Sequence, residues 1–332
     1  MSSFDLVKPR GVPPRNPELL VERDVPPRLH DLRTGAPLYQ VSKDLATSIN
    51  VALSIGAPLL LTGDPGTGKT QLAYYLAWYF GIEADVPPPR RQQPFTLAVK
   101  STTVARDLLY RFDTVAYFRD ARVAKQGEGD DRIDKWKFLT KGPLWRAVEE
   151  IKATRPAVVL IDEIDKAPRD FPNDLLQELD QFRFYVDEVD HTEEVPADRP
   201  PPVVVITSNS EKPLPTAFLR RCVFHHIEFD EQLIRTAIAS WRASQAQGPK
   251  GWEAAEAGAS EVALPELSAR DEAAMRAFLR VRDVGDLEKV PATAELLGWL
   301  SALDASGIQT SELSEGKRLE DLLLLSALLK DR

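Results

Sequence analysis

Continuous apolar runs alternate with stretches of helical periodicity through the first two thirds of the chain. The runs at 59–61 and 157–161 are apolar throughout, and the run at 203–207 is apolar up to its last residue, as the buried strands of a parallel sheet are. Between them, apolar residues recur at helical spacing, most clearly over 44–55 and 144–151. Strands that alternate with helices predict an α/β fold, an open parallel sheet with helices on both faces.

Other segments of this region follow the same two patterns. The polar, glycine-bearing segment 126–137 is expected to be an exposed excursion. Further helices are predicted over 71–80, 104–118 and 175–182, and further strands over 95–99 and 223–229.

The pattern changes near residue 231, where the apolar strand-like runs stop. A Leu-rich stretch at 319–329 and Ala-rich segments follow, with a loop rich in Gly, Ala and Glu at 248–260. Before residue 37 the chain is rich in Pro and Arg, which opposes helix and favours an extended arm. We therefore predict an arm at 1–36, an α/β core at 37–230 and a small all-helical domain at 231–332.

Composition places the chain among ordinary globular proteins. Its 332 residues, 43% apolar and 28% charged, suffice for about two domains with cores of their own. The net charge of −9 argues against a dedicated nucleic-acid binder. Cys222 is the only cysteine, so an internal disulfide is excluded. With no signal-peptide pattern and no apolar stretch long enough to span a bilayer, we expect a soluble, cytoplasmic protein with no membrane partner.

The most specific motif is GDPGTGKT at 63–70, which matches the phosphate-binding P-loop. A predicted strand precedes it and a predicted helix follows it, as the motif requires. Its glycines let the backbone turn N–H groups toward an anion, Lys69 would reach the β/γ-phosphates, and the Thr70 hydroxyl would complete a Mg²⁺ shell. The predicted cofactors are ATP and Mg²⁺, and the predicted nucleotide-binding residues are Gly63, Asp64, Pro65, Gly66, Thr67, Gly68, Lys69, Thr70 and Gln71.

Two carboxylates follow the strand predicted at 157–161. In P-loop ATPases an acid here holds Mg²⁺ and the next orients the attacking water, so Asp162 is the candidate metal residue and Glu163 the candidate base. A buried strand capped by a polar turn is the alternative; the upstream P-loop favours the catalytic interpretation.

Two polar features follow the strand predicted at 203–207. Asn209 is either an ordinary turn former or an amide that bonds the attacking water or the γ-phosphate. Arg220 and Arg221 are either a solvated face or the source of an arginine finger for a neighbouring subunit.

In this order, the motifs resemble those of AAA+ ATPases, and several strings resemble the MoxR branch. The resemblance covers roughly residues 37–300. It implies that Asn209 is the sensor-1 residue and that Arg221 is the finger, with Arg220 as second choice. The strings are PLLLTGDPGTGKTQLA at 58–73, GPLWRAVEE at 142–150, VVLIDEIDKAP at 158–168 and VITSNSEKPLPTAFLRRCVFHHIEF at 205–229.

The resemblance also carries expectations beyond the site. It implies a P-loop AAA+ core followed by a helical lid, two inserts within about 102–138 and 184–201, and a possible sensor-2 arginine in the lid. Ala294 stands at that arginine's position here, and Lys289 is a candidate substitute.

The resemblance also implies a ring, usually of six copies in this family. Such a ring would hydrolyse ATP and remodel or mature a protein in a chaperone-like way, often with a von Willebrand factor A domain partner. A nucleic-acid-directed motor, as in helicase loaders or restriction systems, and a slow ATP-controlled scaffold in a defence system are the alternatives. The acidic charge favours a protein partner over nucleic acid. Glu163 argues against slow hydrolysis.

Overall fold

The chain divides into two compact units in the computed structural model, and each is described by itself. The first comprises Val41–Gly63 and Lys69–Ile227, and the second Met1–Gln40, Asp64–Gly68 and Glu228–Arg332. Most of the predicted arm, the loop at 248–260 and the Leu-rich stretch at 319–329 lie outside the described residues. The structure describes residues 32, 35–82, 93–124, 133–209, 211–247, 264–283 and 290–306.

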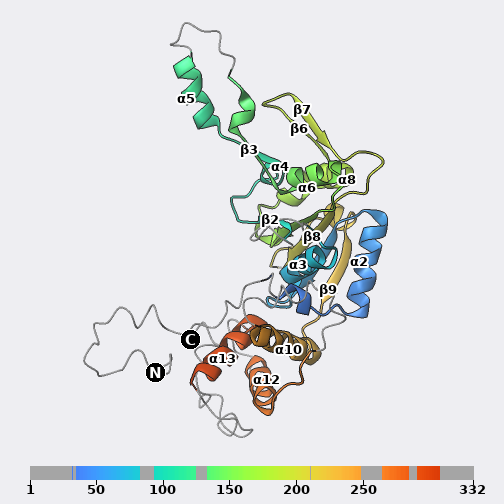
Figure 1. Cartoon of the computed structure of the whole chain (residues 1–332), viewed down its shortest axis with the longest axis vertical. Coiled ribbons are helices and arrows are strands. Elements are labelled where there is room, and N and C mark those ends of the chain that lie inside the picture. Colours follow the sequence, from blue (N-terminus) through green and yellow to red (C-terminus); the bar gives the residue numbers. More distant parts are fainter. Residues whose placement is uncertain are drawn as a thin grey trace, which may run out of the picture. The chain divides into compact units, whose positions relative to one another are not determined.

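A five-stranded parallel sheet forms the centre of the first unit (Figure 1). The predicted α/β arrangement is therefore confirmed, and the apolar runs are its buried central strands. Their side chains are buried on both faces because helices cover the sheet. In spatial order the strands are β2 (Phe95–Ala98), β5 (Val158–Asp162), β8 (Val203–Ser208), β1 (Leu59–Gly63) and β9 (Val223–Ile227).

Three longer helices contact this sheet: α2 (Lys43–Ile55), α3 (Lys69–Tyr79) and α6 (Pro143–Lys152). Ser42 caps α2 by accepting a hydrogen bond from the Leu45 N–H at 3.1 Å. The apolar stripe of α6 is buried, and Pro143 occupies its first turn, where a missing N–H costs nothing. Shorter helical turns lie at Ala36–Leu38 (η1), Ile164–Lys166 (η3), Phe171–Asp174 (α7), Leu176–Gln181 (α8) and Thr216–Leu219 (α9).

The helix predicted over 104–118 is wrong. Leu108 and Leu109 are buried in a short helix that ends at Leu109, because Tyr110 adopts an extended backbone with φ −163° and ψ 168°. Tyr110 instead begins a strand that pairs antiparallel with a later one, at a sequence distance that periodicity does not reveal. The elements found are α4 (Arg106–Leu109), β3 (Tyr110–Phe112), α5 (Thr114–Ala124), η2 (Lys135–Phe138) and β4 (Leu139–Lys141).

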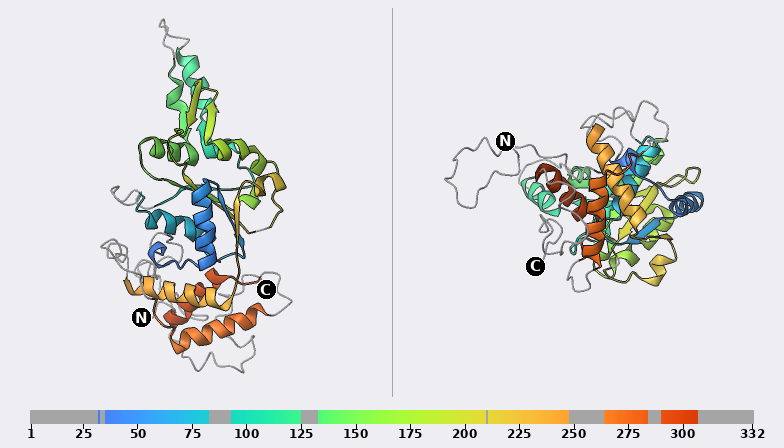
Figure 2. Two further views of the ribbon diagram at one scale, coloured as in Figure 1. Left: turned by 90° about the vertical axis from the view of Figure 1, so that its right-hand side faces the viewer. Right: turned by 90° about the horizontal axis from the view of Figure 1, so that it is seen from below.

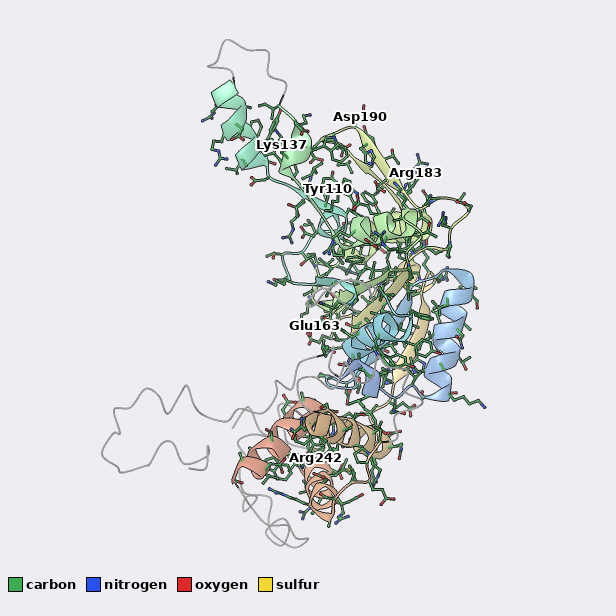
Figure 3. The ribbon with its side chains drawn as sticks, in the orientation of Figure 1. Tyr110, Lys137, Glu163, Arg183, Asp190 and Arg242 are labelled. Atoms are coloured by element: carbon green, nitrogen blue, oxygen red, sulfur yellow. The ribbon has the colours of Figure 1, made fainter. Side chains whose placement is uncertain are left out.

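A hairpin precedes β8, as predicted within 184–201. It consists of β6 (Arg183–Val186) and β7 (His191–Glu194). In Figure 3, Arg183 lies at the base of this hairpin and Asp190 at its far end. Of the polar excursion predicted at 126–137, only residues 133–137 are described. The helical turn η2 begins there at Lys135.

All regular elements of the second unit, within the described part of the chain, are helices. Figure 2 shows α10 (Glu231–Gln247), α12 (Ala269–Arg282) and α13 (Thr293–Ser306) packed together. Phe278 and Trp299 are fully buried between them. Arg242, labelled in Figure 3, pairs with both Asp271 and Asp304 and so ties the three helices by charge. In neither unit do the described helices include one with the length and apolarity needed to cross a membrane.

Candidate active site

The P-loop has the backbone that its glycines predict. Gly66 and Gly68 have φ angles of +79° and +87°, a region that glycine enters without strain. Thr67 is buried and donates a hydrogen bond to the Asp64 carbonyl at 2.9 Å, which closes the turn. Lys69 begins α3, and its Nζ donates to the Gly63 carbonyl at 2.7 Å. The lysine side chain is buried, and its ammonium is held at the residue where the loop begins.

Two hydroxyl groups converge on one oxygen of Asp162. The Thr70 hydroxyl donates to Oδ1 at 2.8 Å, and the Thr207 hydroxyl donates to the same atom at 2.7 Å. The Glu163 N–H donates to the Thr207 oxygen at 2.8 Å. These bonds join the first turn of α3 to the carboxyl ends of β5 and β8, where ligands bind in open α/β sheets.

Mg²⁺ fits this donor set. It is a hard cation that takes oxygen ligands, usually one or two from the protein with the rest from phosphates and water. Thr70 and Asp162 present a hydroxyl and a carboxylate 2.8 Å apart. The described residues contain no cluster of three or more His, Cys, Asp and Glu side chains that could form an all-protein metal cage. The predicted pair Thr70 and Asp162 is therefore brought together.

Glu163 stands just beyond β5 in a left-handed backbone conformation with φ +60° (Figure 3). A residue other than glycine is held there only when its surroundings fix it, and such positions cluster at functional sites. The Lys166 ammonium donates to Glu163 Oε2 at 2.5 Å, and this bond raises the pKa of Lys166. The candidate base is therefore paired with a cation of its own chain.

Asn209 is brought to the same edge of the sheet because β8 lies between β1 and β5. Its backbone N–H donates to Asp165 Oδ1 at 3.3 Å, and the Glu211 N–H donates to Oδ2 at 3.0 Å. Asp165 is 2% exposed, so this carboxylate anchors the segment that follows β8 from inside the fold.

The two candidate fingers differ in their contacts. Arg221 donates through Nε to Asp180 Oδ2 at 2.5 Å and through Nη1 to the Ala217 carbonyl at 3.2 Å. Arg220 is exposed, and within the described residues it forms no ion pair. An Arg221 that serves a neighbour would first have to leave Asp180.

In the second unit, the P-loop residues Asp64–Gly68 lie against the last two helices. Arg282, which ends α12, donates to Asp64 Oδ2 at 3.0 Å and to the Pro291 carbonyl. Its guanidinium also lies 3.6 Å from the centre of the Phe229 ring. The position that the resemblance assigns to a sensor-2 arginine is the second residue of α13, Ala294, and Lys289 lies outside the described residues.

Several of these residues are missed by sequence reasoning. Thr207 precedes Asn209 by two positions, but its role depends on β8 lying beside β5, which the motif does not state. Lys166 follows Glu163 by three residues on a helical turn, and this i, i+3 charge pair was the available signal. Arg282 carries no motif.

Residues 58–222 match the family model of the AAA domain, dynein-related subfamily. The matched segment contains the P-loop, Asp162, Glu163, Asn209 and both arginines. No curated protein matches the chain. Among solved structures, that of a candidate ATPase from Cytophaga hutchinsonii aligns with a TM-score of 0.41 and 12% identity, over 85% of this chain and 78% of that one. The matched segment contains β1, β2, β5 and β8 of the parallel sheet with their flanking helices, which are therefore similar to those of an AAA domain, and described helices follow toward the C-terminus.

Proposed function

We propose that this chain, whose residues 58–222 match the AAA domain, hydrolyses ATP to ADP and phosphate. The observation that carries the proposal is the convergence of Thr70 and Thr207 on Asp162 Oδ1. It brings together the Thr70 hydroxyl of α3, the helix after the P-loop, and the Asp162 carboxylate at the end of β5, which is separated from β1 by β8 in the sheet. Phosphoryl transfer needs this arrangement, because catalysis rests on positioning and charge neutralisation.

Each residue has a role in this reaction. Lys69 and the P-loop N–H groups bind the phosphates, and Thr70 with Asp162 holds Mg²⁺, which would neutralise charge on the β- and γ-phosphates. Glu163 orients the attacking water and accepts its proton once the pairing with Lys166 is released. Asn209 positions the same water from the neighbouring strand.

The finer proposal is a MoxR-like AAA+ motor that assembles into a ring of about six copies. Arg221 or Arg220 of one subunit would complete the charge neutralisation at the next, so hydrolysis would require assembly. The motor would remodel or mature a partner protein in a chaperone-like way, with a von Willebrand factor A domain protein as the expected class. The net charge of −9 supports a protein partner over nucleic acid.

Phosphate release from ATP with Mg²⁺ tests the activity directly. We expect Glu163→Gln to bind ATP but to release phosphate at least roughly a hundredfold more slowly than the wild type, and Lys69→Ala to lose binding. Glu194→Gln, at an exposed carboxylate on β7 of the hairpin, is the matched control and should hydrolyse like the wild type. Equal rates in Glu163→Gln and the control would remove Glu163 from the chemistry.

Light scattering of Glu163→Gln, with and without ATP and Mg²⁺, tests the ring. An increase to the mass of about six subunits only with nucleotide is expected. A monomer at saturating ATP would contradict trans assembly of the chain alone. Adding single- and double-stranded DNA to the phosphate assay tests the alternative of a nucleic-acid-directed motor. Salt-sensitive stimulation of phosphate release by DNA would indicate such a motor.

A further inference from the structure

Backbone pairing between β5 and β8 stops where the candidate catalytic residues begin. The last paired residues are Ile161 and Ile206, and the ladder between the two strands does not continue past them. Glu163 follows two residues after the end of the ladder on one side, and Asn209 follows three residues after it on the other. Pairing between these strands therefore does not fix the spacing of the two groups that are proposed to act on one water molecule.

Side-chain hydrogen bonds continue the connection beyond the ladder. The Glu163 N–H donates to the Thr207 hydroxyl oxygen at 2.8 Å. Further along, the Asn209 N–H donates to Asp165 Oδ1 at 3.3 Å, and the Glu211 N–H donates to Oδ2 at 3.0 Å. A single carboxylate from the segment after β5 thus holds two N–H groups of the segment after β8.

Asp165 is itself held firmly in the fold. It lies in the middle of η3, the helical turn that begins directly after Glu163, and η3 contacts β8. The residue is 2% exposed, so bulk water hardly competes for its carboxylate. A carboxylate buried without donors would be costly, and a hydrogen bond to a charged acceptor is stronger than one between neutral groups. The carboxylate and the two N–H groups therefore hold each other in place.

The contact with Asn209 uses a backbone group and not the side-chain amide. Only two rotatable bonds separate this amide from the backbone, so a shift of the backbone moves the amide with it. Asp165 thus sets where the Asn209 amide stands relative to Glu163. A role in stability alone is the alternative that an experiment has to exclude.

We propose, on the basis of the ATPase activity proposed above, that Asp165 is a positioning residue for hydrolysis. It holds the Asn209 amide against Glu163, so that both groups act on the same attacking water. Lys69 and the P-loop bind the phosphates without it. Asp165 is therefore required for the rate of the chemical step and not for the binding of ATP.

Asp165→Asn tests this role with little change of shape. A carboxamide keeps one acceptor oxygen but turns an NH₂ group toward the second N–H, so one of the two bonds is lost. We expect phosphate release at saturating ATP to fall at least roughly tenfold, because small misplacements of reacting groups are costly. The affinity for a fluorescent, non-hydrolysable ATP analogue should stay within about twofold of the wild type.

Asp170→Asn is the matched control for this substitution. Asp170 is exposed, and its side chain does not cap the helical turn α7 that follows it. The control makes the same chemical change five residues away and should match the wild type in both rate and affinity.

Asn209→Ala separates the positioning of the amide from any other effect of Asp165. Once the amide is gone, losing its anchor should cost nothing further. The double variant Asp165→Asn/Asn209→Ala should therefore release phosphate at the rate of Asn209→Ala alone. If the two losses multiply in the double variant, the residues act independently and the proposal is overturned.

Analogue binding and the melting temperature test the structural alternative. Asp165→Asn should melt below the wild type, since a buried hydrogen bond is lost, so the rates are compared well below that temperature. If affinity for the analogue falls in parallel with the rate, Asp165 serves the fold of the whole site and the proposal is overturned. An unchanged rate would overturn it as well.

Lys69→Ala, measured alongside, distinguishes this failure from failure of the proposed function. If the wild type releases phosphate and Lys69→Ala does not, the ATPase activity stands and the Asp165 variants decide the role of Asp165. If the wild type releases phosphate no faster than Lys69→Ala, the proposed function fails and the positioning role of Asp165 fails with it.

Discussion

The carboxylate of Glu163 and the ammonium of Lys166 share one short hydrogen bond, beside the residues that would hold Mg²⁺. An attacking water must compete with this ammonium for the carboxylate oxygen. The pairing is partly exposed on both sides, so it contributes little to stability and can be released. Lys166 therefore restrains the base at small energetic cost.

Replacing Lys166 with Met tests this restraint. We expect phosphate release at saturating ATP to rise roughly threefold, because Glu163 Oε2 loses its competing donor. Steady-state rates with Lys166→Arg as the matched control would check it, since arginine keeps the charge and should leave the rate near that of the wild type. A rate that falls in Lys166→Met would instead make Lys166 part of the productive geometry.

At the scale of residues, sequence prediction succeeds where a motif fixes a role in advance. Lys69, Thr70 and Asp162 belong to patterns whose spacing follows from phosphate and metal geometry, and Thr70 does meet Asp162. Thr207 acts on Asp162, and Lys166 acts on Glu163, through contacts that the fold creates. Nothing in the chain marks Thr207 until β8 and β5 are placed side by side, whereas Lys166 is marked only by its i, i+3 spacing from Glu163.

Among the elements, β9 forms one edge of the sheet and carries two adjacent histidines. The His225 Nδ1 lies 3.0 Å from the Ser48 hydroxyl of α2, and the His226 Nδ1 lies 2.9 Å from the Thr62 hydroxyl of β1. Burial lowers the pKa of His225 below its ordinary value of 6.5, while Asp44 raises it and His226 lowers it further. The neutral ring therefore fits the fold better than the charged one.

This shift predicts a pH dependence of stability. Below about pH 6.5 the unfolded chain binds a proton that folded His225 resists, so the free energy of unfolding falls as the pH drops. Between pH 7.5 and 5.5 the wild type should lose more of its melting temperature than His225→Asn does, because the variant lacks this titration. Equal losses in the two proteins would assign the acid sensitivity to other groups.

Helix α6 connects the sheet to both inserts through Trp145. Its ring lies 6.0 Å from that of Tyr110 in β3, 5.5 Å from that of Phe184 in β6 and 6.1 Å, stacked, from that of His191 in β7. The side chain is 1% exposed, and its Nε1 has no hydrogen-bond partner within the described ranges. Trp145 therefore stabilises the junction by filling space between these rings and not by hydrogen bonding.

Two substitutions at Trp145 should differ sharply in urea unfolding. Trp145→Ala should cost about 3–5 kcal/mol of unfolding free energy, since it leaves a cavity where three elements meet. Trp145→Phe should cost under about 2 kcal/mol, because an aromatic ring remains and no hydrogen bond is lost. Hydrogen exchange would check the location: amides of residues 183–194 should lose protection in Trp145→Ala before those of α3 do.

At the scale of elements, periodicity located the central strands and the flanking helices to within a few residues. It failed over 104–118, where α4 stops at Leu109 and a three-residue strand follows. That strand exists because Tyr110 pairs with Lys141 and Phe112 pairs with Leu139. A pairing across some thirty intervening residues leaves no periodic trace in either partner.

For the whole molecule, the decisive question is whether Arg221 or Arg220 of one subunit contacts the nucleotide bound to the adjacent subunit. A Lys69→Ala subunit keeps Arg221 for its neighbour but binds no nucleotide itself. An Arg221→Ala subunit binds nucleotide but offers its neighbour no arginine. Each should be inactive alone, while an equal mixture should recover about a quarter of the wild-type rate, the share of interfaces with one intact half from each variant. Phosphate release from the mixture measures this recovery.

The same mixture with Arg220→Ala in place of Arg221→Ala identifies the finger, since only the true finger variant is rescued by Lys69→Ala. Asp180→Ala adds a control, because it releases Arg221 from its partner within the chain. Recovery in neither mixture would mean that the positive charge comes from within the subunit or is not needed.

Residues 113–138 leave the core after Phe112 and return to it at Leu139, and these two residues are paired neighbours on β3 and β4. A segment whose two ends lie side by side can change in length without moving the strands that carry it. A short turn could close the gap at little entropic cost, and a longer or different segment could be spliced in with equal ease. The length of this segment is therefore independent of the geometry around Asp162, so an insertion or deletion within it should leave phosphate release unchanged.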